Sequence, residues 1–150
     1  MNNSTSYWLK KGIHNGMPIA LGYLAVSFTL GIAAKNAGLT ALQAALASIT
    51  CHASAGEFAG FTLIAALAAY TEIAVMELII NARYFLMSCA LSQKLDNKMP
   101  FFHRLIMGLF VTDEIFGLTV SVPEKLNPAY MYGMVLVASP AWVLGTYFGV

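Results

Sequence analysis

Five predominantly apolar runs, separated by short polar segments, dominate the chain. They cover 18–34, 39–71, 73–91, 105–122 and 129–150. Since a transmembrane helix needs about 20 residues, the pattern predicts an all-α membrane protein, a polytopic helical bundle of about five membrane elements. Residues 1–17 are polar, and we interpret them as a cytoplasmic N-terminal segment ahead of a single transmembrane domain, 18–150.

The second run is too long for one straight span. Its 33 residues would form a helix of about 50 Å, against a hydrocarbon core of about 30 Å. The stretch Cys51–Gly60 in its middle contains two glycines and the carboxylate of Glu57. We predict a broken or re-entrant second element, with half-helices at 39–50 and 61–70 that meet at an unwound turn, 54–60.

Basic residues provide an independent argument about topology. They cluster at Lys10 and Lys11 and again between 92 and 104. The positive-inside rule favours both groups on the cytoplasmic side, which requires the second element to enter and leave on one face. This interpretation treats 105–122 as an ordinary span and puts the loop 123–128 outside.

Composition excludes several classes of protein. Apolar residues make up 59% and charged residues 10% of the chain, which differs strongly from a soluble domain. The net charge of +1 lacks the basic excess of a nucleic-acid-binding protein. Cys51 and Cys89 lie in apolar runs and are expected to be buried thiols, and the three histidines have unrelated spacings. No metal and no cofactor is implied.

Five ionisable residues fall at membrane depth: Glu57, Glu77, Arg83, Asp113 and Glu114. Such residues usually line a pathway or a proton relay, although mutual pairing as buried ion pairs is an open alternative.

Helical spacing arranges some of these groups. Glu77, Asn81, Tyr84 and Ser88 form one polar stripe, in which we expect Asn81 and Tyr84 to bind the solute and Glu77 to belong to the ion-coupling charge network. Arg83 points away from the stripe and needs a partner such as Asp113 or Glu114. One of these two acids is expected to carry a proton, and the sequence leaves open which one.

The predicted break offers groups that suit an amino acid. Backbone N–H groups around Ser54 and Gly56 could bind a carboxylate, and Glu57 could meet an ammonium group. A glycine-containing kink used only for packing is the alternative. The chain has no P-loop and no HExxH motif, and His52 replaces the first glycine of a GxSG protease motif. We therefore do not expect an enzyme.

Motifs along most of the chain resemble the AzlC-type branched-chain amino acid permeases. The resemblance is carried, in order, by Pro18, Phe28–Gly31 with Ala34 and Gly38, Ala53–Ala59, Asn81–Tyr84 and Thr112–Glu114. It implies an exporter of leucine, isoleucine, valine, methionine and similar neutral amino acids in the bacterial inner membrane, working with a small AzlD-type membrane subunit. We expect proton coupling.

Some features depart from that family. Glu57 stands where an amide is usual, and Tyr84 stands where histidine is common. Family members are longer, and the last apolar run has no polar tail, so we expect a C-terminally incomplete chain. A non-transporting structural subunit of a membrane complex is the alternative function.

Overall fold

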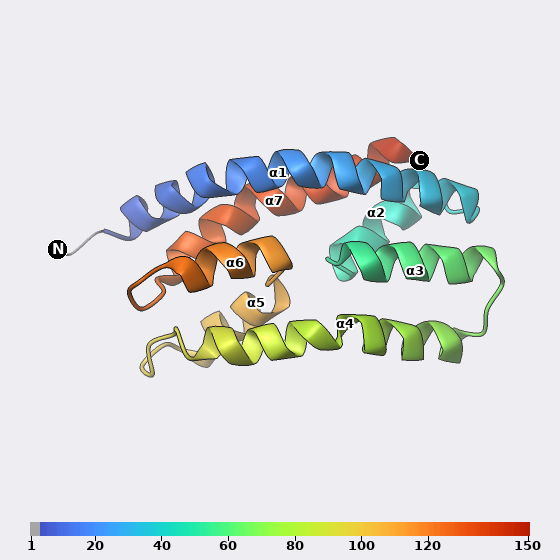
Figure 1. The fold of residues 1–150 in the computed structure, drawn as a ribbon. Helices are drawn as coiled ribbons and strands as arrows, with labels where there is room; N and C mark the ends of the chain where they lie inside the picture. The colour runs from blue at the N-terminus through green and yellow to red at the C-terminus, as the bar shows by residue number, and fades with distance from the viewer. Residues whose placement is uncertain (1–3) are drawn as a thin grey trace. The chain divides into compact units, whose positions relative to one another are not determined.

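The computed structural model describes residues 4–150, and the regular secondary structure of this part is entirely α-helical (Figure 1). Its helices are α1 (Thr5–Asn36), α2 (Ala41–Thr50), α3 (Ser54–Ala65), α4 (Tyr70–Ser92), α5 (Phe101–Leu109), α6 (Asp113–Ser121) and α7 (Pro128–Gly149). Among the described residues, α1, α4 and α7 are long and apolar enough to cross a membrane. The predicted all-α membrane fold is confirmed. Residues 1–3 of the expected N-terminal segment lie outside the described part, and α1 includes the rest of it from Thr5 onward.

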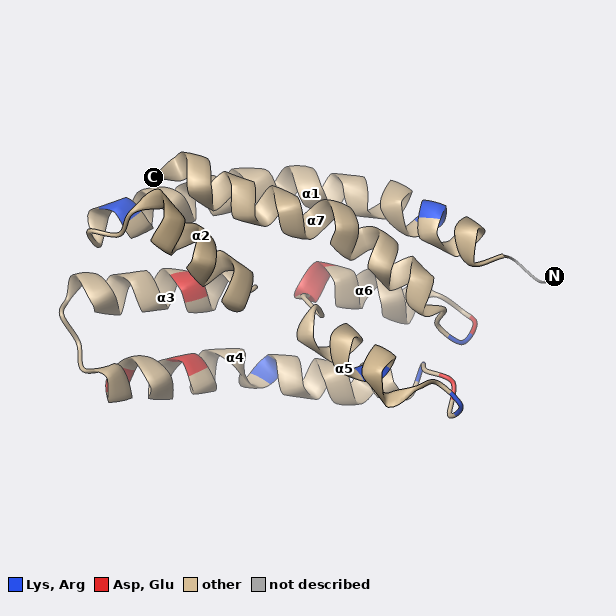
Figure 2. Ribbon diagram, turned by 180° about the vertical axis from the view of Figure 1, so that it is seen from behind, with Lys and Arg blue, Asp and Glu red and all other residues tan. Residues whose placement is uncertain are grey.

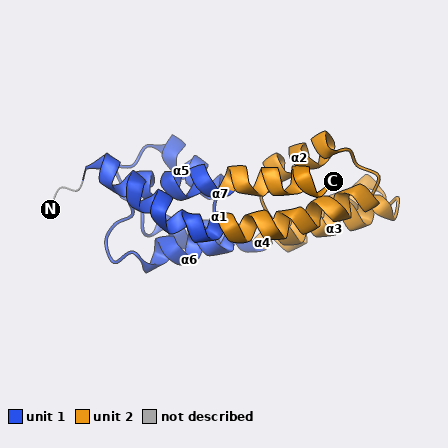
Figure 3. Ribbon diagram, turned by 90° about the horizontal axis from the view of Figure 1, so that it is seen from above, with its two compact units in different colours: residues 1–19, 83–138 blue, residues 20–82, 139–150 orange. Residues whose placement is uncertain are grey.

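The chain folds into two compact units (Figure 3). Unit 1 comprises 1–19 and 83–138 and contains the short helices α5 and α6. Unit 2 comprises 20–82 and 139–150 and contains the short helices α2 and α3.

The second element is broken, as predicted, but at a different place. The break is 51–53, where Ala53 has an extended backbone (φ −146°, ψ 114°). The expected unwound turn at 54–60 is wrong, because these residues form the first turns of α3. A glycine inside a helix costs about 1 kcal/mol, but Gly56 and Gly60 let the Glu77 carboxylate of α4 lie close to α3.

The expected span 105–122 is also broken, which corrects the sequence interpretation. α5 ends at Leu109, and Thr112 then caps α6 by accepting a hydrogen bond from the Ile115 backbone N–H. An extended residue that caps a new helix interrupts the α-helical hydrogen bonding of the apolar run.

The loops before α5 and after α6 are bound to each other in unit 1. The Leu126 N–H donates to the Lys94 carbonyl (2.9 Å), and Lys94 Nζ donates to the Val122 carbonyl (2.5 Å). Lys125 Nζ also donates to the Gln93 carbonyl (3.1 Å). The pair α5–α6 is therefore a hairpin whose two ends lie together, so the expectation of loop 123–128 on the opposite side from loop 92–104 is wrong.

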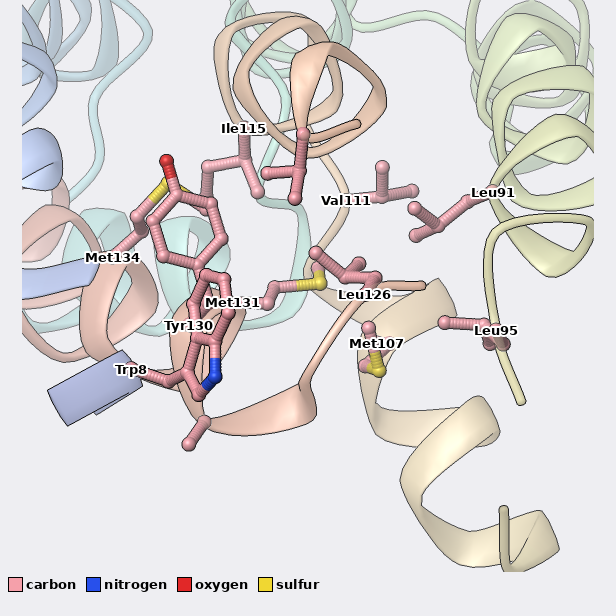
Figure 4. Close-up of a cluster of buried hydrophobic side chains, with 12 residues drawn as sticks. Trp8, Leu91, Leu95, Met107, Val111, Ile115, Leu126, Tyr130, Met131 and Met134 are labelled. Carbon is pink, nitrogen blue, oxygen red and sulfur yellow. The ribbon is translucent and has the colours of Figure 1, made fainter. Parts of the chain in front are cut away.

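An apolar core stabilises unit 1 (Figure 4). Met107 of α5, Ile115 of α6 and Met131 of α7 are fully buried in it, and Trp8 of α1 stacks edge-on against Tyr130. The core thus includes side chains from both halves of the α5–α6 hairpin. The thiol of Cys89 lies outside it and is exposed, contrary to expectation.

Glycines bring α1 and α7 together within each unit. In unit 1, a Cβ on Gly12 or Gly133 would meet backbone atoms of the facing helix. In unit 2 the same holds for Gly31 and Gly149. Small residues allow this close approach of helices without help from bulky side chains.

Candidate functional site

A buried carboxylate forms the centre of a polar cluster in unit 2. Glu57, in the first turn of α3, is 2% exposed. Its Oε2 accepts a hydrogen bond from Ser48 Oγ of α2 (2.7 Å), and its Oε1 accepts one from Trp142 Nε1 of α7 (2.6 Å). Ser48 Oγ also lies 2.7 Å from Thr146 Oγ1. We call Ser48, Glu57, Trp142 and Thr146 the Glu57 cluster.

The Glu57 cluster contains neutral hydrogen-bond donors and no basic side chain. Within residues 4–150 the ion pair observed is Arg83–Asp113, so Glu57 has no cationic partner there. Ser48 and Thr146 are fully buried and Trp142 is 3% exposed, so water does not surround the carboxylate. An ionised carboxylate buried without a cation is costly. Glu57 is thus chemically suited to take up a proton or a positively charged group.

Aromatic rings lie beside this cluster. Tyr23 of α1 packs edge-on against Trp142, with ring centroids 5.0 Å apart. His52, in the break between α2 and α3, also packs against Tyr23 and bonds Ser139 Oγ through Nε2 (3.2 Å). The break is thereby held against the C-terminal part of α7.

A second polar cluster surrounds Glu77 of α4. Asn81 Nδ2 donates to Glu77 Oε2 (2.7 Å), and the Cys51 thiol lies 3.7 Å from the same oxygen. A Cβ on Gly56 would lie 2.6 Å from this oxygen, so α3 and the Glu77 carboxylate are in close proximity. We call Cys51, Gly56, Glu77 and Asn81 the Glu77 cluster (Figure 2 shows acidic residues on α3 and α4).

The Glu77 cluster lacks one hydrogen-bond donor. Asn81 Oδ1 is buried and has no hydrogen-bond partner. The orientation of the amide follows from Glu77, because the carboxylate accepts and the Asn81 NH₂ group must face it. A buried acceptor without a partner costs about 1–3 kcal/mol. The cluster therefore suits a ligand that brings N–H groups.

The N-terminus of α3 differs from that of α2. Thr40 and Gln43 form a full capping box at α2, whereas Ala53 gives α3 no side-chain cap. Ser54 is half-buried and Gly56 is buried at this end. The first N–H groups of α3 thus have no side-chain acceptor at the cap and point toward the N-terminal end of the helix, where the dipole is positive.

The remaining predicted site residues lie in unit 1. Arg83 Nη1 pairs with Asp113 Oδ2 at 2.8 Å, and Arg83 Nη2 donates to the Tyr84 hydroxyl (3.2 Å). Of the two acids that the sequence left open, Asp113 is therefore the partner of Arg83. The predicted stripe is divided, since Glu77 and Asn81 belong to unit 2 and Tyr84 to unit 1. Glu114 follows Asp113 in the first turn of α6 and is exposed.

Sequence reasoning missed four residues of unit 2: Ser48, His52, Trp142 and Thr146. Ser48 and Thr146 are single hydroxyls within apolar helices, where such residues usually serve packing. Trp142 was the one of these residues that the sequence could have indicated, because a buried indole N–H requires a hydrogen-bond acceptor.

Comparison with protein families identifies the chain. A family model described as "AzlC protein" matches residues 18–150. The chain belongs to the AzlC family. With three helices of spanning length and composition among the described residues, this AzlC-family chain is a multi-pass membrane protein.

Relatives of this AzlC-family chain are membrane proteins. An uncharacterized membrane protein of Archaeoglobus fulgidus is 34% identical over 147 residues, which is 98% of this chain and 64% of the relative. The inner membrane protein YgaZ of Escherichia coli is 22% identical over 143 residues, 93% of this chain and 58% of the relative. The chain thus spans about three fifths of the length of these relatives. No solved structure matches it.

Proposed function

We propose that this chain forms the transmembrane domain, 18–150, of a secondary exporter of small neutral amino acids in the bacterial inner membrane. The substrates are leucine, isoleucine, valine and methionine, and an AzlD-type small membrane subunit completes the transporter within the lipid bilayer. Membership of the AzlC family and the inner-membrane relative support this proposal. The chain itself has a transport role and no enzymatic one, and it needs no cofactor.

Proton coupling is assigned to Glu57. The observation that carries the assignment is its burial among Ser48 and Trp142, two neutral donors, without a cation. Both donors also suit the protonated form, because Trp142 can donate to the carbonyl oxygen and Ser48 can accept from the acid hydroxyl. The carboxyl group can therefore gain and lose a proton with only a rotation of the Ser48 hydroxyl.

The substrate amino group is assigned to the Glu77 cluster. An ammonium group would pair with Glu77 and supply the donor that Asn81 Oδ1 lacks. The substrate carboxylate would bind the N–H groups of Ser54 and Gly56 at the uncapped start of α3. A neutral amino acid carries both groups, whereas an amine or a fatty acid carries only one.

The other predicted residues form a separate charge network. Asp113 compensates Arg83, which also binds Tyr84. Glu114 is the second acid of this network, and we propose that it takes part in ion coupling beside Glu57.

The N-terminus is assigned to the cytoplasm. Six of the eight Lys and Arg residues belong to the start of α1, to α5 and to the two bonded loops: Lys10, Lys11, Lys94, Lys98, Arg104 and Lys125. All six lie in unit 1. The positive-inside rule places such a group on the cytoplasmic side.

Efflux from dipeptide-fed cells tests the proposed function. Cells that express the full-length protein with its small subunit should release leucine, isoleucine, valine or methionine faster than cells with either protein alone. Efflux that is unchanged for all four amino acids, with both proteins in the membrane, would rule out this substrate class. A structural subunit would give that result together with intact co-purification of the partner.

A further inference from the structure

The order of helices repeats within the chain. A long helix, a short helix, a three-residue break and a second short helix form α1–α2–α3, and the same order recurs as α4–α5–α6. The breaks are 51–53 and 110–112. The connections before and after the first hairpin are short, at 37–40 and 66–69. Such a repetition in a membrane protein can arise from an internal duplication.

A short sequence motif recurs near the start of the second short helix of both copies, from the fourth residue of α3 and from the second residue of α6. Glu57-Phe-Ala-Gly60-Phe-Thr62 in α3 matches Glu114-Ile-Phe-Gly117-Leu-Thr119 in α6. The identical positions are Glu, Gly and Thr, and every other position is apolar in both. The hydroxyls of Thr62 and Thr119 each donate to a backbone carbonyl of their own helix, at Phe58 four residues back (2.7 Å) and at Phe116 three residues back (2.9 Å).

The second hairpin opens to the side on which α1 begins. In unit 1, the loops 93–100 and 122–127 are hydrogen-bonded to each other. Trp8, the fourth residue of α1, lines the same surface pocket as Asp96 and Glu124 from these loops. The start of α1 and both ends of the α5–α6 hairpin therefore lie together.

The first hairpin opens to the side on which α1 ends. In unit 2, α2 follows α1 after four residues, and α3 leads into α4 after four more. Figures 1 and 2 show the end of α1, the end of α3 and the start of α4 at the same end of unit 2, with α2 following the end of α1. A helix that crosses the membrane once has its ends on opposite sides, so the two hairpins enter from opposite sides.

We infer that 5–65 and 70–121 are two copies of one helix-plus-hairpin unit, inserted in opposite orientations, and that Glu114 is the counterpart of Glu57. Inverted repeats with discontinuous helices are an arrangement that transporters use for alternating access. Each hairpin then supplies one carboxylate to the pathway, reached from its own side of the membrane. The orientation of the repeats does not depend on the proposed substrate.

Cysteine labelling tests the inverted orientation. The full-length protein with Cys51→Ser and Cys89→Ser provides the background. Single cysteines replace exposed residues at Asn36 and Ala69 for the first hairpin and at Asn97 and Glu124 for the second. A membrane-impermeant maleimide is applied to intact spheroplasts and to inside-out vesicles. We expect Asn97→Cys and Glu124→Cys to react from one side, and Asn36→Cys and Ala69→Cys from the other.

Labelling of Asn97→Cys and Glu124→Cys from opposite sides would overturn the inference, because 105–122 would then be a span.

The equivalence of Glu57 and Glu114 has its own test. Glu114→Gln should lower the initial efflux rate about tenfold or more, as Glu57→Gln does, while Glu124→Gln stays within about twofold. Normal efflux for Glu114→Gln alongside an inactive Glu57→Gln would overturn the equivalence. Labelling requires no transport. The orientation of the two hairpins can therefore be determined even if none of the proposed amino acids is exported.

Discussion

The acidic residues that follow the helix breaks in the two units, Asp113 and Glu57, differ in charge compensation and in exposure. In unit 1, Thr112 caps α6, and Asp113 forms an ion pair with Arg83 in which the side chains are 42% (Arg83) and 50% (Asp113) exposed. In unit 2, α3 has no side-chain cap, and Glu57 is 2% exposed between Ser48 and Trp142. The charge of Asp113 is balanced inside the protein, and that of Glu57 is not.

This difference supports the proposal of a structural role for Asp113 and a transport role for Glu57. A carboxylate with a matched cation is satisfied in the resting protein and needs no further partner. A buried carboxylate with only neutral donors becomes stable when a proton or an ammonium group arrives. The comparison therefore contrasts an acid compensated by a cation in unit 1, Asp113, with a buried acid that has no cation in unit 2, Glu57. The following predictions test that division, beginning with the largest expected effect.

Glu57→Gln should abolish export. Glutamine keeps the size of the side chain and both hydrogen bonds, since its amide can donate to Ser48 and accept from Trp142, but it cannot exchange a proton. We expect export to fall about 100-fold with little change in thermal stability, measured by dipeptide-fed efflux and by unfolding in detergent. Export that survives this substitution would remove Glu57 from the mechanism and erase the contrast between the units.

Gly31→Ala should destabilise the protein by about 1–3 kcal/mol. Its Cβ would collide with the backbone of Thr146 and Gly149, and backbone atoms cannot move aside. Gly133→Ala in unit 1 should cost a similar amount for the same reason. Gly22→Ala is the control, because nothing lies within 4 Å of its Cβ. Unequal costs at Gly31 and Gly133 would show that helix packing, and not only charge, differs between the units.

Gly56→Ala should reduce export about threefold, because the new Cβ would displace the Glu77 carboxylate, which lies at the end of a flexible side chain. The apparent affinity for substrate should change more than the stability. Gly117→Ala in α6 is the matched control, since the space around its Cβ is open. If both variants export equally well, the Glu77 cluster does not bind substrate.

Asp113→Asn should have the smallest effect. The ion pair with Arg83 is half-exposed, so its loss should cost about 0–1 kcal/mol. A double-mutant cycle with Arg83→Gln and Asp113→Asn, measured by thermal unfolding, gives the coupling energy. A coupling energy of several kcal/mol would show that the pair is shielded from water in the assembled transporter. Asp113 and Glu57 would then differ only in that Asp113 has a cationic partner.

Much of the fold could be predicted from the sequence, and the reasons for the errors are physical. The first hairpin was detectable because 33 apolar residues are too many for one span. The second hairpin was missed because 105–122 has the length of a normal span. The repeated Glu-x-x-Gly-x-Thr motif was the available signal for it, since internal repeats indicate repeated structure.

The candidate site could be predicted only where its residues lie on one helix. Glu77 and Asn81 are one turn apart, so their contact follows from helical spacing. The partners of Glu57 come from α2 and α7, and Trp142 is far from it along the chain. Spacing gives no information about such contacts, because they depend on how the helices pack.

The bond between Trp142 and Glu57 gives the protein an internal optical reporter. The chain has two tryptophans, and Trp8 belongs to the other unit. Trp8→Phe would leave a single indole whose N–H donates directly to the carboxyl group assigned to proton exchange. Its fluorescence would then follow the occupancy of that carboxyl group in real time, without an added dye and without a measurement of flux.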